Sequence, residues 1–167
     1  MLMRMTIAIA AIALLVAAGS SIAASPSAGE PATPSIARGK YLVTIGACND
    51  CHSPGWRESD GTLPVGKWLV GSSTGLREAW GTSYPANLRV MFSRITEAQW
   101  LFEVRTRGGR MQWHDLRVLT TDDQRSIYRF VHSLGPKGVL TPGDVPPDRE
   151  PATSYIDLRL HTPEPRQ

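Results

Sequence analysis

Cys48-Asn49-Asp50-Cys51-His52 is the stretch that decides the fold of this 167-residue chain. Two cysteines separated by two residues and followed directly by histidine form the attachment motif of c-type haem. Two thiols at this spacing add to the two vinyl groups of one porphyrin, and the adjacent imidazole then lies under the ring as an iron ligand. Cys48 and Cys51 are the only cysteines in the chain. We therefore predict one covalently bound haem c, attached to Cys48 and Cys51, with His52 as the proximal axial ligand.

Two other uses of a C-x-x-C motif are zinc binding and thiol redox chemistry. A structural zinc site needs a second pair of cysteines or histidines at close spacing. The other histidines are scattered and form no such pair; they are His114, His132 and His161. A dithiol redox centre is typical of a thioredoxin-like alternation of strands and helices, which the sequence does not show. Both remain as less favoured alternatives to haem attachment.

Residues 1–24 are predicted to be a secretory signal peptide. Arg4 supplies the positive charge, Ile7 to Ala18 is a continuous apolar run, and small residues near Ala24 offer a cleavage site. An uncleaved membrane anchor is the alternative, although the run is rich in alanine and short for a membrane span. Export agrees with c-type haem, which is attached after translocation. We expect a periplasmic protein, bound to the membrane if the signal is retained.

Composition excludes one class of partner. The chain has 18 basic and 15 acidic residues and a net charge of +3 at pH 7. This charge is too small for a nucleic-acid-binding domain. The sequence also has no glycine-rich phosphate loop and no cluster of acidic residues for a metal ion.

The chain beyond the signal divides into three parts. Residues 25–34 are rich in Ser, Pro, Ala and Gly and are expected to form a linker. Residues 35–140 are expected to form the haem domain, and residues 141–167 a Pro-rich C-terminal extension that lies along the domain or along a partner. Residues 54–86 show little periodicity, and we predict a long loop that wraps the haem edge.

Helical periodicity and capping signals predict three helices, at residues 36–47, 97–106 and 122–134. Thr96 and Thr121 each begin a T-x-x-Q capping box before the second and third helix. Three helices with the haem motif after the first predict an all-α class, with the helices arranged around the haem.

Gly39 lies inside the first predicted helix, where glycine costs about 1 kcal/mol relative to alanine. This cost indicates that another element approaches closely at that point. We expect the last helix to cross the first one here, with Tyr128 or Val131 near Gly39.

The sixth iron ligand decides what the haem does. Met91 and Met111 are the methionines that remain after signal cleavage. Met111 lies on a loop between two predicted helices and is expected to reach the iron from the face opposite His52. Met91 is expected to fill the core; a sixth site formed by Met91 or His114, or left open, stays as an alternative.

Two features are expected around the haem. The carbonyl of Pro54 is a candidate acceptor for the other ring nitrogen of His52, since metal-bound histidines donate that N–H to a fixed acceptor. Six arginines flank Met111 in sequence and suggest a basic collar for an acidic partner, with a solvated surface as the alternative; they are Arg89, Arg94, Arg105, Arg107, Arg110 and Arg117.

The sequence from Ser35 to Gly135 resembles the class I cytochrome c family. Three segments carry the resemblance: residues 37–42 leading into the haem motif, residues 80–88, and residues 111–128. The resemblance implies the small cytochrome c fold and a role like that of cytochromes, and cytochrome subunits, that accept electrons from periplasmic dehydrogenases. That family has a distal Met-Pro-aromatic motif, and this chain has Met111-Gln112-Trp113 instead.

We expect an exported monohaem electron carrier between a dehydrogenase and a downstream acceptor, and not an enzyme. Ligation by His52 and Met111 keeps the iron six-coordinate and raises its reduction potential, because a thioether favours Fe(II). The alternatives are a haem sensor or peroxidatic protein with an open sixth site, assisted by His114, and a subunit held on a dehydrogenase by its extension.

Overall fold

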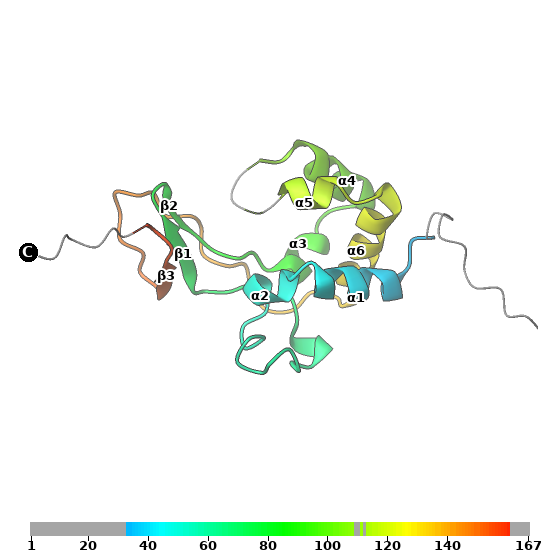
Figure 1. The fold of residues 1–167 in the computed structure, drawn as a ribbon, viewed down its shortest axis with the longest axis horizontal. Helices are drawn as coiled ribbons and strands as arrows, with labels where there is room; N and C mark the ends of the chain where they lie inside the picture. Colours follow the sequence, from blue (N-terminus) through cyan, green and yellow to red (C-terminus); the bar gives the residue numbers. More distant parts are fainter. Residues whose placement is uncertain (1–32, 109–110, 112, 161–167) are drawn as a thin grey trace, which may run out of the picture. The chain divides into compact units, whose positions relative to one another are not determined.

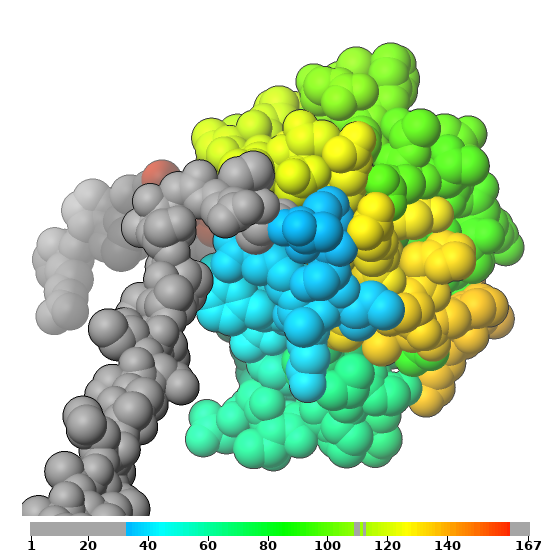
Figure 2. All heavy atoms as spheres, turned by 90° about the vertical axis from the view of Figure 1, so that its right-hand side faces the viewer, coloured from blue at the N-terminus to red at the C-terminus, as the bar shows by residue number. Residues whose placement is uncertain are grey.

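Helix α1 (Ile36–Ile45) crosses helix α6 (Thr121–Ser133) at Gly39, as the sequence predicts (Figure 1). The computed structural model describes residues 33–108, 111 and 113–160. A Cβ atom at Gly39 would lie 1.9 Å from the Ser126 carbonyl oxygen and 2.7 Å from Phe130 Cβ. The expectation of Tyr128 or Val131 at this point is therefore wrong, because Ser126 and Phe130 occupy the face of α6 that meets α1. The space-filling view shows α1 directly beside α6 (Figure 2).

The start of α1 depends on two hydroxyl groups. Ser35 Oγ accepts a hydrogen bond from Arg38 N (3.1 Å) and caps the helix, while Ser35 N donates to Ser126 Oγ (3.1 Å). Ser126 Oγ in turn donates to the Asp122 carbonyl (2.7 Å). A single small side chain of α6 thus binds both helices at their crossing.

The second predicted helix is α4 (Glu97–Thr106), and its bounds are as expected. Its capping box is confirmed: Thr96 Oγ1 accepts from Gln99 N (3.2 Å), and Gln99 Oε1 accepts from Thr96 N (2.7 Å). The expected capping box at Thr121 is wrong, because the N-cap of α6 is Thr120. Gln124 instead donates to two carbonyls of the preceding turn, those of Leu116 and Leu119.

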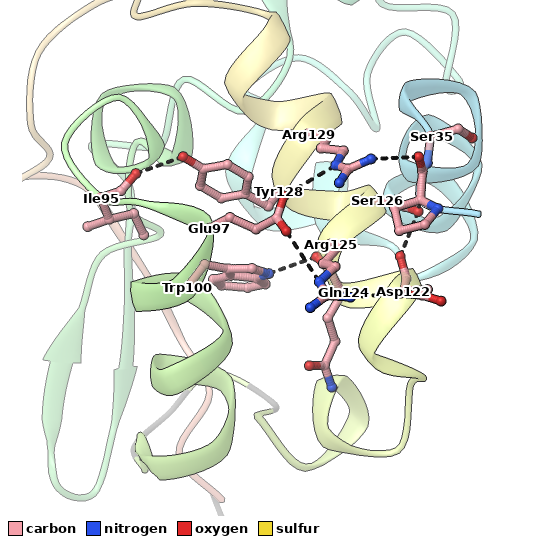
Figure 3. Close-up of polar contacts among 11 residues, drawn as sticks. Ser35, Ile95, Glu97, Trp100, Asp122, Gln124, Arg125, Ser126, Tyr128 and Arg129 are labelled. Carbon is pink, nitrogen blue, oxygen red and sulfur yellow. Dashed lines mark hydrogen bonds and ion pairs between the residues drawn. The ribbon is translucent and has the colours of Figure 1, made fainter. Parts of the chain in front are cut away.

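Polar contacts also bind α6 to α4 and to Ile95, two residues before α4 begins (Figure 3). Trp100 Nε1 donates to the Gln124 carbonyl (2.8 Å), and the Tyr128 hydroxyl donates to the Ile95 carbonyl (2.9 Å). Glu97 forms ion pairs with Arg125 (3.3 Å) and Arg129 (3.2 Å). The last helix is therefore the common neighbour of the first helix and of α4.

Three short helices complete the helical part of the described chain: α2 (Cys48–His52), α3 (Leu88–Phe92) and α5 (Trp113–Arg117). One 3₁₀ turn, η1 (Val65–Lys67), lies in the predicted long loop. The helices and this loop share one hydrophobic core, whose members are Leu42, Val43, Trp68, Leu69, Phe92, Trp100, Leu101, Val104, Trp113, Leu116, Ile127, Phe130 and Val131.

A three-stranded sheet was not part of the all-α expectation. Strands β1 (Gly75–Glu78) and β2 (Gly81–Ser83) form an antiparallel hairpin, and β3 (Tyr155–Asp157) pairs with β1 in parallel. The C-terminal extension therefore supplies a strand to the domain. The hairpin lies within the segment 54–86 that we expected to be a loop.

Two expectations concern residues outside the described chain. The predicted signal peptide (1–24) and most of the linker (25–34) lie there, as does His161. Within the described residues, no helix combines the length and the apolar character that crossing a membrane requires.

Replacing Gly39 with alanine tests the helix crossing. We expect Gly39→Ala to lower the free energy of unfolding by about 2–3 kcal/mol, because the backbone carbonyl of Ser126 must move away. Gly66→Ala is the control, since a Cβ there has no neighbour within 4 Å, and it should change stability by less than about 0.5 kcal/mol. Denaturant titration of both variants measures the effect; a Gly39→Ala protein as stable as wild type would contradict the crossing.

The Asp123 carboxylate gives the fold a defined pH dependence. Arg38 Nε and Nη2 donate to its two oxygens at 2.8 and 3.2 Å, and this hydrogen bonding lowers the pKa of Asp123 below its usual value. Because the folded-state pKa is lowered, the stabilisation is complete above about pH 5 and is lost as the pH falls through that pKa.

We expect Asp123→Asn to remove the part of the acid destabilisation that arises from protonation of Asp123. The difference in unfolding free energy between wild type and variant should be about 0.5–1 kcal/mol at neutral pH, since Arg38 is partly exposed. It should shrink toward zero near pH 2–3. A difference that stays constant over this range would contradict the assigned pair.

Candidate haem attachment site

Helix α2 places both thiols and the imidazole on one face. Gly46 ends α1, and Ala47, in the left-handed region at φ 54°, starts the new helix direction. Cys48, Cys51 and His52 then occupy positions i, i+3 and i+4, which share one face of a helix. Cys48 is half-buried, Cys51 is exposed, and neither forms a disulfide.

The imidazole of His52 is held in a defined protonation state. His52 is buried, and its Nδ1 lies 2.7 Å from the Ala86 carbonyl oxygen. A carbonyl only accepts, so Nδ1 carries the hydrogen. Burial lowers the pKa of His52, which favours the neutral ring. Nε2 therefore carries the free lone pair, as an iron ligand must.

The carbonyl that accepts the hydrogen bond from His52 Nδ1 differs from the one expected. The sequence prediction named the Pro54 carbonyl, but the Ala86 carbonyl, 34 residues from His52, takes this role. Pro54 immediately follows Ser53, whose backbone turns away in an extended conformation. The short segment 85–87 between β2 and α3 returns to His52, and no periodicity or capping signal marks a backbone oxygen at that distance.

Hydrogen bonds also fix the main chain around His52. The His52 carbonyl accepts from Gly71 N (2.9 Å). Ser53 Oγ donates to Asn49 Oδ1 (2.7 Å) and accepts from Leu69 N (2.7 Å). Helix α2 is thus bound to the loop 69–71 through the His52 carbonyl and the Ser53 hydroxyl.

The alternatives to haem find less support at this site. Burial raises the pKa of the Cys48 thiol to about 11, whereas a dithiol redox centre needs a lowered thiol pKa. Among residues 33–108, 111 and 113–160, no group of three or more His, Cys, Asp or Glu side chains is placed to hold a metal ion. A four-ligand zinc site needs such a group.

The two methionines have similar surroundings. Met111 is half-buried and packs against the same hydrophobic core as Cys48, and Met91 on α3 also packs there. The Met111 carbonyl accepts from Trp113 N (2.8 Å), which joins it to α5. Gly109, Arg110 and Gln112 lie outside the described residues.

His114 and Arg89 differ from their expected roles. The His114 side chain is 71% exposed, and its Nε2 lies 2.9 Å from an Asp115 carboxylate oxygen, so it points to solvent. Arg89 is buried and donates to the carbonyls of Gly66, Leu134 and Gly135. Arg89 therefore binds the end of α6 to η1 and is not part of a surface collar.

Arg107 and Arg117, two other members of the expected collar, are exposed and lie near Met111 in sequence. Arg107 stacks over the Trp113 ring at 5.6 Å and pairs with Glu103 (2.9 Å). Arg117 donates to the Arg107 carbonyl (3.0 Å). Positive charge thus gathers where α4 ends, at Arg107, and where α5 ends, at Arg117, and Arg107 is partly neutralised by Glu103.

Comparisons of the chain with protein-family models, with curated proteins and with solved structures give no significant match. The interpretation of the site therefore rests on its residues and their geometry.

The residues present fit a c-type haem. The donor set is two free thiols and a neutral imidazole on one helical face, together with a half-buried thioether that packs on the same core as Cys48. A thioether and an imidazole are the axial pair of electron-transfer cytochromes. The fixed Nδ1–H is the outer contact that such a histidine requires.

Ser53 is the residue whose removal tests the support of α2. Ser53→Ala leaves the buried Leu69 N without its acceptor and Asn49 Oδ1 without its donor, so we expect a loss of about 2 kcal/mol in unfolding free energy. Ser93→Ala is the control, because Ser93 is exposed and its hydroxyl donates only to the Val90 carbonyl at the end of α3. Denaturant titration of both variants is the measurement, and equal losses would contradict the role given to Ser53.

Proposed function

We propose that this chain is an exported monohaem c-type cytochrome that carries single electrons between a dehydrogenase and a downstream acceptor. The observation that supports this most is the His52 Nδ1–Ala86 hydrogen bond at 2.7 Å. It fixes the tautomer whose Nε2 can bind iron, and it does so in the residue that directly follows C-x-x-C.

Four residues would bind the haem. Cys48 and Cys51 would hold the porphyrin through two thioether bonds, His52 Nε2 would be the proximal ligand, and Met111 Sδ the distal one. The haem supplies an iron that takes up and releases one electron. The thioether of Met111 raises the reduction potential because it is a soft ligand that favours Fe(II).

The protein contributes rigidity around the ligand. His52 is bound through Nδ1 to Ala86 and through its carbonyl to Gly71 N, and Ser53 binds Leu69. A ring held through Nδ1, on a main chain that is itself bound to the loop, is expected to move little between oxidation states. Little rearrangement on electron transfer is what a carrier needs, and no catalytic side chain is proposed.

The rival function is a haem sensor or peroxidatic protein with an open sixth site. It needs a polar side chain above the iron, for which the sequence offers His114. The exposure of the His114 side chain and its contact with the neighbouring Asp115 favour the electron carrier over this rival. The proposed partners are a periplasmic dehydrogenase as donor and a terminal acceptor.

Visible spectra of the purified, exported protein in both oxidation states test the proposal. We expect a low-spin c-type spectrum when reduced, and a Met-to-iron charge-transfer band when oxidised. Rapid binding of carbon monoxide by the reduced protein and no charge-transfer band would favour the rival function. A colourless protein would contradict both.

Met111→Ala tests the distal ligand. We expect loss of the charge-transfer band, binding of carbon monoxide to the reduced protein, and a fall in reduction potential on the order of 0.1 V, within the range that axial ligands set. Met91→Ala is the matched control, since Met91 is also half-buried against the core, and it should keep all three properties. The reverse pattern would assign Met91 as the ligand.

A further inference from the structure

Asn87 connects Ala86, whose carbonyl accepts the hydrogen bond from His52 Nδ1, to the segment that follows α6. Its side chain is fully buried, and Oδ1 accepts from Val90 N (3.1 Å), which caps α3. Nδ2 donates to the carbonyls of Lys137 (2.8 Å) and Val139 (2.9 Å). The residue that shares a peptide group with Ala86 is therefore bound at three points, and two of them lie in the segment that follows α6.

Gly71 packs against the peptide group between Ala86 and Asn87. It has φ +77°, and a Cβ atom there would lie 2.9 Å from Ala86 C and 2.6 Å from Asn87 N. The same Cβ would lie 2.6 Å from Thr141 Cγ2. Since Gly71 N also donates to the His52 carbonyl, this glycine contacts His52, its acceptor and residue 141 at once.

The Ala86 carbonyl has no regular secondary structure to hold it, because it lies between β2 and α3. Its position depends on the peptide group that it shares with Asn87. The Asn87 side chain, bound to the carbonyls of Lys137 and Val139, and the close approach of Gly71 to the peptide group itself both oppose its turning away from His52.

We propose that residues 137–141 act through Asn87 to hold the Ala86 carbonyl on His52 Nδ1, which makes Asn87 a positioning residue for the proximal ligand. The inference rests on the proposed function, since it concerns the ligand strength of His52. A fixed acceptor raises the basicity of the bound imidazole, and this favours Fe(III). Loosening the acceptor should raise the reduction potential.

The attachment of the C-terminal extension to Arg77 provides a matched control. Arg77 is buried and donates to the carbonyls of Pro147 (3.3 Å) and Arg149 (3.0 Å), and it pairs with Glu150 (3.4 Å). Arg77→Met removes the contacts between β1 and residues 147–150. It does not change any partner in the three hydrogen bonds of Asn87. It is a stability control for any effect of loosening the extension in general.

The experiment compares Asn87→Ser with Arg77→Met in the full-length protein with its haem. Asn87→Ser keeps a hydroxyl to cap α3 and loses the two bonds to residues 137 and 139. We expect the exchange of the His52 Nδ1 proton with solvent, followed by NMR in the reduced state, to accelerate about tenfold or more, and the reduction potential to rise. Arg77→Met should lower the unfolding midpoint and leave proton exchange within about twofold of wild type and the potential unchanged.

Two results would overturn the inference: no change in exchange or potential in Asn87→Ser, or equal changes in Arg77→Met. If Asn87→Ser does not fold, Asn87→Thr serves, because its hydroxyl can still accept from Val90 N while the two donations to the carbonyls of residues 137 and 139 are lost; it should raise the potential, and an unchanged potential would count against the inference. A wild-type protein without covalent haem would instead refute the proposed function.

Discussion

The hydrogen bond between His52 Nδ1 and the Ala86 carbonyl is the constraint on which the rest of the site depends. It joins the haem motif to a backbone oxygen 34 residues away, so the loop between them must return to α2. The loop is held there by two hydrogen bonds: Gly71 N donates to the His52 carbonyl, and Leu69 N donates to Ser53 Oγ. The long segment that lacks periodicity is therefore the part of the chain that orients the imidazole.

The helices supply the frame in which this loop is held. Gly39 lets α1 approach the main chain of α6 at Ser126, and α6 is bound in turn to α4 through Trp100. Arg89, buried in α3, binds the end of α6 to η1. Since α3 begins directly after Ala86 and Asn87, the helical frame and the acceptor of His52 are connected through the backbone itself.

The sequence predicted those features that are encoded locally. Helix α4 has the bounds expected from its capping box, the crossing at Gly39 follows from an otherwise costly glycine, and the haem motif identifies Cys48, Cys51 and His52 as the site to examine. The Ala86 acceptor and the sheet were not predicted, because both depend on distant contacts. Strand β1, Gly-Leu-Arg-Glu, has no β-branched residue and is held instead by β3 and by Arg77, whose partners lie about 70 residues away.

The measurement that tests the central claim most directly is the intact mass of the exported protein after denaturation. A covalent attachment through Cys48 and Cys51 predicts the mass of the chain plus one haem, and predicts that acid–acetone leaves the pigment on the polypeptide. The mass of the chain alone, or a pigment that passes into the solvent, would contradict the account.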